Sequence, residues 1–164
     1  MIVMCPCMIE SNHFLWYLLA ASLIRTLKGE PFMALEVSFS GGKKVDANFK
    51  GFTIKTDQSE KDGGEGSAPT PSFLFFASLG TCAGLYALNF CEKRKIDTSQ
   101  LKLVLDFETH PKTHMVTKIV MNLTLPSDFP DKYVPAIIKA MDLCYVKKHL
   151  HEPPAFETIT QRAV

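Results

Sequence analysis

Residues 63–91 read GGEGSAPTPSFLFFASLGTCAGLYALNFC, and this stretch decides the fold. A Gly- and Pro-rich loop opens it, and no charged residue lies between Glu65 and Glu92. Pro71 followed by Ser72, a good N-cap residue, predicts a long helix that runs to about Lys95. Because this helix would be apolar on every face, we expect a central helix that is covered by a sheet on one side and by another subunit on the other.

Length alone would also permit a transmembrane helix here. Ser78, Thr81 and Asn89 and the lack of basic residues before the helix argue against that alternative, and we expect no membrane association. A second apolar run, FLWYLLAASLI at 14–24, is too short to span a bilayer. No Lys or Arg precedes it, so the basic region of a signal peptide is missing.

Residues 1–32 are expected to be an N-terminal extension, either peripheral to the fold or the product of a start upstream of the natural one. Met33 opens MALEVSFSGGKKVDA, which looks like a protein start followed at once by a strand. A weak signal peptide and a true structural helix remain alternatives for the extension. We expect residues 33–164 to form a single domain, since 164 residues fit one domain.

The composition is that of an ordinary globular protein, with 46% hydrophobic residues and a net charge of +1 from 18 basic and 17 acidic residues. This balance excludes intrinsic disorder and gives no basic surplus for nucleic acid. The five cysteines are an odd number without regular spacing or a CxxC pair, unlike the framework of a secreted disulfide-rich protein. Free thiols suit a reducing compartment, so a cytoplasmic location is expected.

Hydrophobic alternation predicts an α+β order around the long helix. Three short strands would form an N-terminal β-meander, and two longer ones a β-hairpin after the helix. A second helical region and a final strand would follow. The predicted strands are 34–40, 44–49 and 51–55, then 101–109 and 115–125, and last 156–160; the helical region starts at about Asp128 and includes a short turn at 146–150.

Cys82, inside the helix, and Cys144, just past the second helix, are the candidates for thiol chemistry. A reactive Cys82 needs a nearby cation or hydrogen-bond donor, because the thiolate is the nucleophile. The basic residues after Cys144, or the Lys43-Lys44 pair, would serve if they fold over it. The competing interpretation is zinc held by Cys144, His149 and His151, or by His110 and His114. Neither spacing matches a zinc finger, so no metal is expected.

Two motifs carry a resemblance to a known family. GGEGSAPTPSFLFFASLGTC (63–82) and CYVKKH (144–149) resemble the OsmC/Ohr family of osmotically inducible and organic-hydroperoxide-resistance proteins. The resemblance covers about 34–160, and the expected order of strands and helices is also the family's. It implies a two-layer OsmC-like domain, an intertwined homodimer that buries the central helices, and a role in the stress response.

The resemblance also implies a thiol peroxidase. Cys82 would reduce a small organic hydroperoxide to an alcohol and become a sulfenic acid, and Cys144 would condense with it to a disulfide. An external dithiol, such as a lipoyl group or a small thiol, would reduce that disulfide, so no bound cofactor is expected. The alkyl group would lie against the apolar residues around Cys82, which are Phe75, Phe76, Leu79 and Tyr86.

Two positions depart from the peroxidase branch of that family. Lys43 stands where the branch has an Arg, and Ser72 stands where it has a Glu that pairs with this Arg. Glu65 is the candidate to replace that Glu from the loop. Lys lacks the bidentate fork of Arg, so thiolate activation would be weaker. The alternative is therefore a non-enzymatic dimer of the same fold that senses redox state or binds a small ligand.

Overall fold

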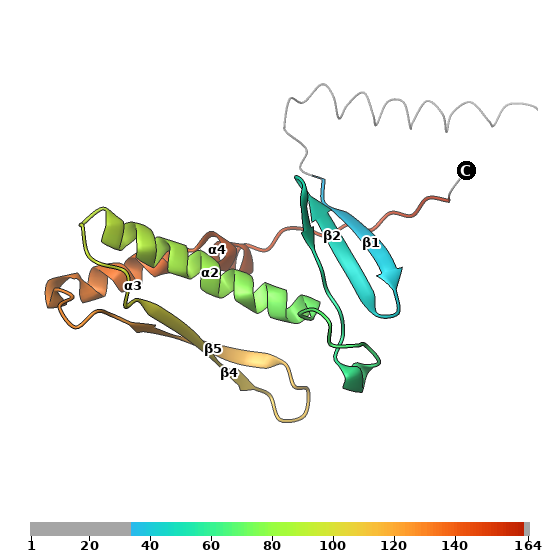
Figure 1. The fold of residues 1–164 in the computed structure, drawn as a ribbon, viewed down its shortest axis with the longest axis horizontal. Helices are drawn as coiled ribbons and strands as arrows, with labels where there is room; N and C mark the ends of the chain where they lie inside the picture. Colours follow the sequence, from blue (N-terminus) through green and yellow to red (C-terminus); the bar gives the residue numbers. More distant parts are fainter. Residues whose placement is uncertain (1–33, 163–164) are drawn as a thin grey trace, which may run out of the picture. The chain divides into compact units, whose positions relative to one another are not determined.

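The structure, a computed structural model, describes residues 34–162, so the interpretations of residues 1–32 lie outside the described residues. The described part of the chain consists of two compact units, one made of residues 34–38 and 47–54, the other of 39–46 and 55–162. Two small sheets and three α-helices make it a mixed α+β protein, as the sequence predicts (Figure 1).

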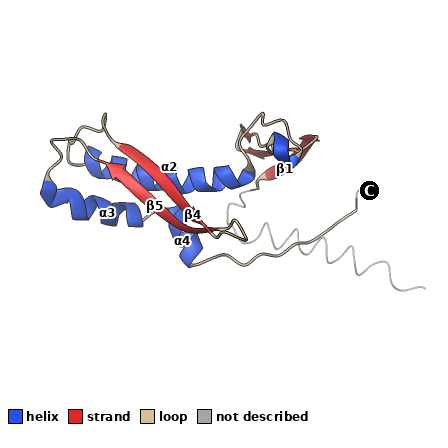
Figure 2. Ribbon diagram, turned by 90° about the horizontal axis from the view of Figure 1, so that it is seen from below, coloured by secondary structure: helices blue, strands red, loops and turns tan. Residues whose placement is uncertain are grey.

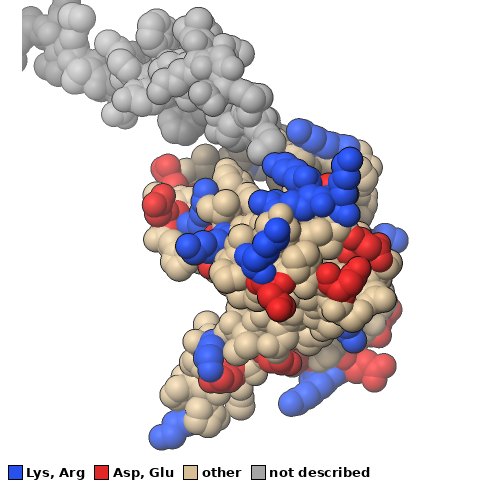
Figure 3. Space-filling view, turned by 90° about the vertical axis from the view of Figure 1, so that its left-hand side faces the viewer, with Lys and Arg blue, Asp and Glu red and all other residues tan. Residues whose placement is uncertain are grey.

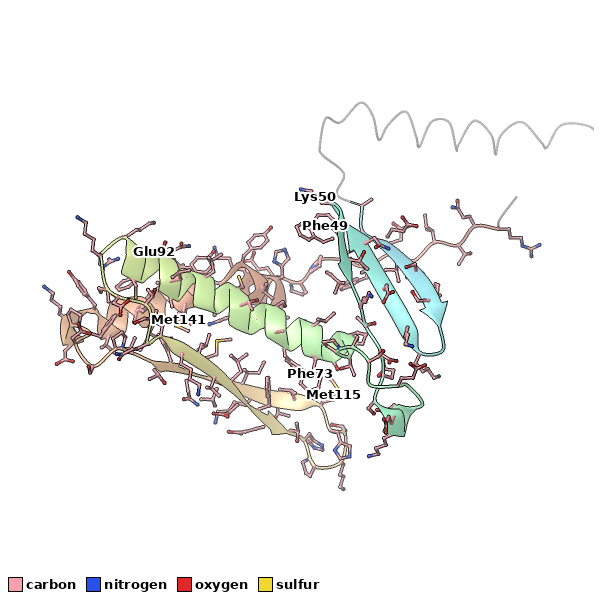
Figure 4. The ribbon with its side chains drawn as sticks, in the orientation of Figure 1. Phe49, Lys50, Phe73, Glu92, Met115 and Met141 are labelled. Carbon is pink, nitrogen blue, oxygen red and sulfur yellow. The ribbon has the colours of Figure 1, made fainter. Side chains whose placement is uncertain are left out.

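The N-terminal strands form the predicted meander. The strands β1 (Glu36–Gly41), β2 (Lys44–Phe49) and β3 (Phe52–Ile54) are hydrogen-bonded in the order β1-β2-β3. Phe49 pairs with Phe52, so Lys50 and Gly51 form a two-residue turn in which both φ angles are positive, 47° and 83°. Positive angles at both central residues are what the favoured hairpin turn requires. Phe49 and Lys50 are labelled in Figure 4.

A buried carboxylate holds the Gly-rich loop together. The side chain of Asp57 is fully buried and accepts hydrogen bonds from the hydroxyl and the backbone N–H of Ser67, at 2.7 and 3.0 Å. It also accepts from the backbone N–H groups of Gln58 at 2.8 Å and Glu65 at 3.2 Å. These bonds, led by the Ser67 hydroxyl, lower the pKa of Asp57 to about 2.

Gly64 lies inside this loop, directly after the short 3-10 helix η1 (Glu60–Asp62) and Gly63. A Cβ at Gly64 would lie 2.0 Å from the backbone oxygen of Gln58 and 2.8 Å from the Asp57 carboxylate. Only glycine therefore permits the close approach of backbone that the Asp57 clamp requires.

The long helix α2 spans Pro71–Glu92. Its N-cap is Thr70, whose hydroxyl accepts from the backbone N–H of Phe73, and Pro71 occupies the first helical position. The expected N-cap, Ser72, is wrong by two residues, because Pro is favoured at the first position and needs no partner for a missing N–H. The helix ends at Glu92, with Lys93 as C-cap, and not at Lys95.

The hairpin of β4 (Lys102–Thr109) and β5 (Val116–Thr124) is antiparallel and lies lengthwise along α2 (Figures 1 and 2). Its apolar cross-strand pairs include Leu103 with Leu123 and Leu105 with Met121. The approach to α2 is close at Gly80, where an added Cβ would lie 3.1 Å from a methyl of Leu105. The small residues of α2 thus let β4 approach its backbone, as their spacing suggests.

The second helical region comprises the 3-10 helix η2 (Asp131–Tyr133), α3 (Val134–Asp142) and α4 (Tyr145–His151). Helix α3 packs against α2, and the core between them contains Ile137 and Met141. Residues of α2 and of the segments around α3 complete this core: Ala83, Ala87, Phe90, Cys91, Phe129 and Cys144.

The expected final strand is wrong for the single chain. Residues 156–160 adopt no regular structure and pair with neither described sheet. A strand needs a neighbouring strand to take up its backbone hydrogen bonds, and here Phe156 and Ile159 are 90% and 78% exposed.

Helix α2 is only partly buried within one chain. It is long and apolar enough to cross a membrane, a test that the core helix of a soluble protein also passes, and 22% of its apolar window is buried. Phe73, labelled in Figure 4, is 67% exposed, and Leu85 is 52% exposed. One chain thus leaves large apolar side chains of α2 uncovered, and their burial by a second subunit stays a prediction.

Charged side chains of both signs share the end of the molecule seen in Figure 3. Lys and Arg lie beside Asp and Glu there, with uncharged surface between them. This mixture agrees with the net charge of +1 and is typical of a solvated surface.

Candidate functional site: paired thiols between two helices

Cys82 and Cys144 lie near enough that each thiol shifts the pKa of the other. Cys82 is half-buried in the middle of α2, whereas Cys144 is fully buried and is the N-cap residue of α4. Packing of α4 against α2 brings the two thiols together. Both are free thiols in this structure.

The first turn of α4 supplies donors to the Cys82 sulfur. The backbone N–H groups at the start of a helix have no partner inside it. Burial by itself raises the pKa of Cys82, but the backbone N–H of Val146, the thiol of Cys144 and the backbone N–H of Tyr145 all donate to the thiolate. Together these bonds hold the pKa of Cys82 below its ordinary value.

The pKa of Cys144 is shifted upward, opposite to that of Cys82. Burial raises its pKa, the backbone N–H groups of Lys147 and Val146 offset part of that, and the neighbouring Cys82 raises it further. The two pKa values are therefore shifted in opposite directions, and Cys82 is the more easily ionised thiol of the pair. This is the division needed between an attacking sulfur and one that reacts later.

The structure does not bring Lys43 or Glu65 into the thiol pair. Lys44, and not Lys43, forms an ion pair with Glu65, at 2.6 Å between Nζ and Oε2. This hydrogen bond raises the pKa of Lys44. Lys43 is exposed in the turn after β1. Within the described chain, the low pKa of Cys82 thus has hydrogen bonds, and no cation, as its cause.

Of the four residues expected to contact the alkyl group of the substrate, three lie on the Cys82 face of α2 and the fourth, Phe76, does not. Phe75, Leu79 and Tyr86 share one face of α2 with Cys82, at helical spacing. Leu79 is fully buried, Tyr86 packs against the core, and Phe75 is about half exposed. Phe76 instead faces β4, where its ring centroid lies 4.9 Å from that of Phe107.

The backbone of Tyr145 and Val146 is the part of the site that side-chain motifs do not reveal. A signal was present, since Cys144 directly precedes a short predicted helical turn, and a residue in that position lies beside unpaired N–H groups. Cys91 is fully buried in the core, and burial raises its pKa, as suits a packing residue.

No group of three or more His, Cys, Asp or Glu residues in the described range 34–162 is arranged to hold a metal ion. His110 instead orders the loop between β4 and β5, because its Nδ1 accepts from the backbone N–H groups of Lys112 and Thr113 at 3.3 and 3.2 Å. His149 bonds to the backbone oxygen of Tyr145 at 2.9 Å.

Fold and site together define an α+β domain with two adjacent thiols, one on a long apolar helix. The chain belongs to the OsmC-like protein family, whose sequence profile matches residues 64–159, more than half of its length. A comparison with curated proteins finds no match.

Solved structures show the same fold. A protein described as osmotic-stress-induced and detoxification-response, from Psychrobacter arcticus 273-4, has a TM-score of 0.62 at 19% identity, covering 73% of this chain and 88% of that one. A hypothetical protein from Aquifex aeolicus VF5 has a TM-score of 0.54 at 16% identity, covering 76% and 90%. The OsmC-like protein VCA0330 from Vibrio cholerae gives 0.53 at 15% identity, covering 73% and 93%.

Proposed function

We propose that this protein is a thiol-dependent peroxidase that reduces organic hydroperoxides to alcohols. The observation that carries the proposal is the pairing of Cys82, whose pKa is lowered, with the buried thiol of Cys144. Membership in the OsmC-like family supports the same reaction class.

The reaction has three steps. The Cys82 thiolate attacks the outer oxygen of ROOH, the O–O bond breaks, and the RO⁻ that leaves takes a proton to become ROH. Cys82 is now a sulfenic acid. The Cys144 sulfur then attacks the Cys82 sulfur, water leaves, and a disulfide forms. An external dithiol, such as a lipoyl group or a small thiol, gives two electrons and two protons and restores both thiols.

The surroundings of Cys82 favour an alkyl hydroperoxide over hydrogen peroxide. Phe75, Leu79 and Tyr86 lie on the same face of α2, and each buried methylene of a substrate contributes about 0.8 kcal/mol. Lys43 and Glu65 remain candidates for holding and polarising the Cys82 thiolate. In this proposal they act on the thiol of a second copy, because within one chain neither contributes to the low pKa of Cys82.

A homodimer is part of the proposal. Helix α2 leaves Phe73 and Leu85 uncovered, and Phe156 and Ile159 extend into solvent beyond α4. A second copy would cover these apolar surfaces, which a lone chain leaves in water. The free-thiol chemistry suits a cytoplasmic protein.

Peroxide consumption by the full chain tests the proposal. Wild type should turn over cumene hydroperoxide with dihydrolipoamide or dithiothreitol, and Cys82→Ser should abolish turnover. Cys144→Ser should consume one equivalent and stop as a sulfenic acid that dimedone traps. Cys91→Ser is the matched control, since this third described thiol lies in the core away from the pair, and it should keep turnover. A wild-type protein that consumes no hydroperoxide with any dithiol would refute the proposal.

A redox-sensing dimer without turnover is the second candidate. It is favoured by one observation, that Glu65 of the Gly-rich loop is paired with Lys44 and not with Lys43. This candidate predicts that peroxide forms the Cys82–Cys144 disulfide reversibly while repeated turnover stays absent. A peptide map after one equivalent of cumene hydroperoxide, followed by a turnover assay, separates the two.

A further inference from the structure

A cavity of about 570 Å³ lies among β5, α3 and α4. Neither Cys82 nor Cys144 lines it, and its walls are mostly apolar, with Leu79, Met121 and Ile137 among them. Its volume is in the range of sites that take small organic molecules, about 300–1,000 Å³. The buried Met141 of α3, labelled in Figure 4, also belongs to the wall.

Five polar residues belong to the lining, two of them basic: Asn122, Thr124, Asp142, Lys147 and His151. Lys147 and His151 come from α4, and Asp142 comes from the end of α3. The Lys147 side chain is 24% exposed and donates one hydrogen bond to Asp142, at 2.6 Å, while the Asp142 side chain is 64% exposed. The Lys147 ammonium is thus held at a mostly exposed carboxylate, while the Lys147 side chain as a whole is largely buried.

An ammonium has three N–H donors, and the bond to Asp142 uses one of them. The remaining donors are available to an acceptor at the mouth, and His151 adds a further donor beside them. Apolar surface continues outward, because Ile138 and Leu150 line the cavity and are 54% and 51% exposed. Such an arrangement complements a molecule with a hydrocarbon chain and an anionic end.

We propose that this cavity binds a long-chain fatty acid, with the hydrocarbon chain between β5, α3 and α4 and the carboxylate at Lys147 and His151. Neither thiol lines this cavity, which shares Leu79 with the residues expected to contact the substrate beside Cys82, and the proposal goes beyond the peroxidase reaction. Binding needs no redox chemistry and no change at Cys82.

Chain length is the first test, and titration calorimetry with decanoate and laurate on the full-length protein measures it. Each added methylene should tighten binding about fourfold, so laurate should bind roughly 16-fold more tightly than decanoate. Dodecanol should bind about 10-fold more weakly than laurate, because it lacks the charge that Lys147 recognises. Lys147→Met should remove that difference between laurate and dodecanol.

The location of the bound fatty acid is tested with a matched pair of surface variants. Leu150→Glu places a carboxylate in the lining and should weaken laurate binding at least 10-fold. Leu143→Glu makes the same change at a residue that is 54% exposed and does not line the cavity, and it should bind laurate like wild type. Both positions are at the surface, so both variants should fold, which circular dichroism checks. Cys82→Ser should also bind laurate like wild type.

Three results would overturn the proposal. Absence of laurate binding would mean that the cavity is closed in solution, for example by a second copy. Affinity that does not depend on chain length would indicate adsorption to the surface. Equal losses in Leu150→Glu and Leu143→Glu would place the fatty acid somewhere other than this cavity.

Discussion

At the scale of single residues, the Cys82 sulfur illustrates how a backbone can replace a cation. Two N–H groups from the start of α4 and one thiol donate to it, and together they outweigh the effect of burial on its pKa. These donors are fixed by the helix, so they lose no side-chain freedom when the thiolate forms. The thiolate is thereby stabilised without any of the basic residues that the sequence offers.

The contribution of Cys144 to this pKa can be measured. Cys144→Ala removes one donor and should raise the pKa of Cys82, whereas Cys144→Ser keeps a donor and should leave it closer to wild type. The rate of iodoacetamide labelling of Cys82 against pH gives the midpoint in a Cys91→Ser background. Equal midpoints in the alanine and serine variants would show that the Cys144 thiol makes no such bond.

Asp57 predicts a dependence of stability on acid. Its pKa is about 2 in the folded chain, below the ordinary value of about 3.9. A carboxylate with a depressed pKa stabilises the fold fully above the ordinary value, and this stabilisation is lost as the pH falls through the folded value. Asp57→Asn should therefore lower the urea midpoint at neutral pH, and its difference from wild type should shrink between about pH 4 and pH 2.

Asp62→Asn is the control for that experiment. Asp62 belongs to the same loop, is exposed, and bonds only the Ser59 hydroxyl at the surface, at 2.6 Å. Its replacement should move the urea midpoint little at any pH. If Asp57→Asn behaved like Asp62→Asn, the buried clamp would not hold the loop.

Individual residues also mark the limit of sequence reasoning about the site. Cys82 and Cys144 were predictable because each lies in a sequence motif, and in the structure each affects the pKa of the other. The ion pair of Glu65 with Lys44, and not with Lys43, was not predictable. Lys43 lies in the turn and Lys44 is the first residue of β2, so which lysine reaches Glu65 depends on where the strand begins, and composition does not fix that boundary.

At the scale of elements, two glycines of α2 should respond differently to alanine. A Cβ at Gly84 would make an ordinary contact with Leu103, at 3.9 Å, while one at Gly80 would lie 3.1 Å from Leu105. Gly84→Ala should stabilise the protein by up to about 1 kcal/mol through helix propensity. Gly80→Ala should gain less or lose stability, because the Leu105 side chain must shift.

Urea unfolding of both glycine variants provides the comparison, and Leu105→Val combined with Gly80→Ala tests the cause. The smaller residue at 105 should recover part of the difference between the two sites. Destabilisation by Gly84→Ala would contradict the prediction and would reveal another surface packed against this face of α2.

Elements were predictable wherever the pattern was long and regular. The helix α2 and the β4–β5 hairpin follow directly from their hydrophobic periods. The ends were harder, since Thr70 and Ser72 are both good caps and the choice depends on the proline between them. The prediction of a last strand at 156–160 was wrong for a different reason. Alternation there shows that the segment can pair as a strand, but it does not show that a partner strand is present.

At the scale of the whole molecule, the exposed apolar surfaces predict a homodimer. Light scattering during gel filtration should give twice the mass of 18.3 kDa. Leu85→Glu places a charge on the uncovered part of α2 and should shift the protein toward monomer, while Lys93→Glu, in the exposed C-cap, should not. A wild-type mass of one chain at all concentrations would contradict the assembly.

The fold class was predictable at this scale, whereas the covering of the central helix by a second subunit stays a prediction. The absence of charge between Glu65 and Glu92 indicates that α2 is covered, but one chain covers only 22% of its apolar window. Sequence periodicity reports how much surface must be buried and is silent on which copy of the chain buries it.

Gly64 limits how the sequence of this loop can change during evolution. Gly63 and Gly66 are glycines because of their backbone angles, with φ of 82° and 60°, and Asn or Asp can adopt such angles. Gly64 instead faces the Gln58 oxygen, so no side chain fits there while Asp57 keeps its bonds. Saturation mutagenesis should find that Gly63 and Gly66 tolerate some substitutions and that Gly64 tolerates none. Neutral sequence change in this loop is therefore confined to two of its three glycines.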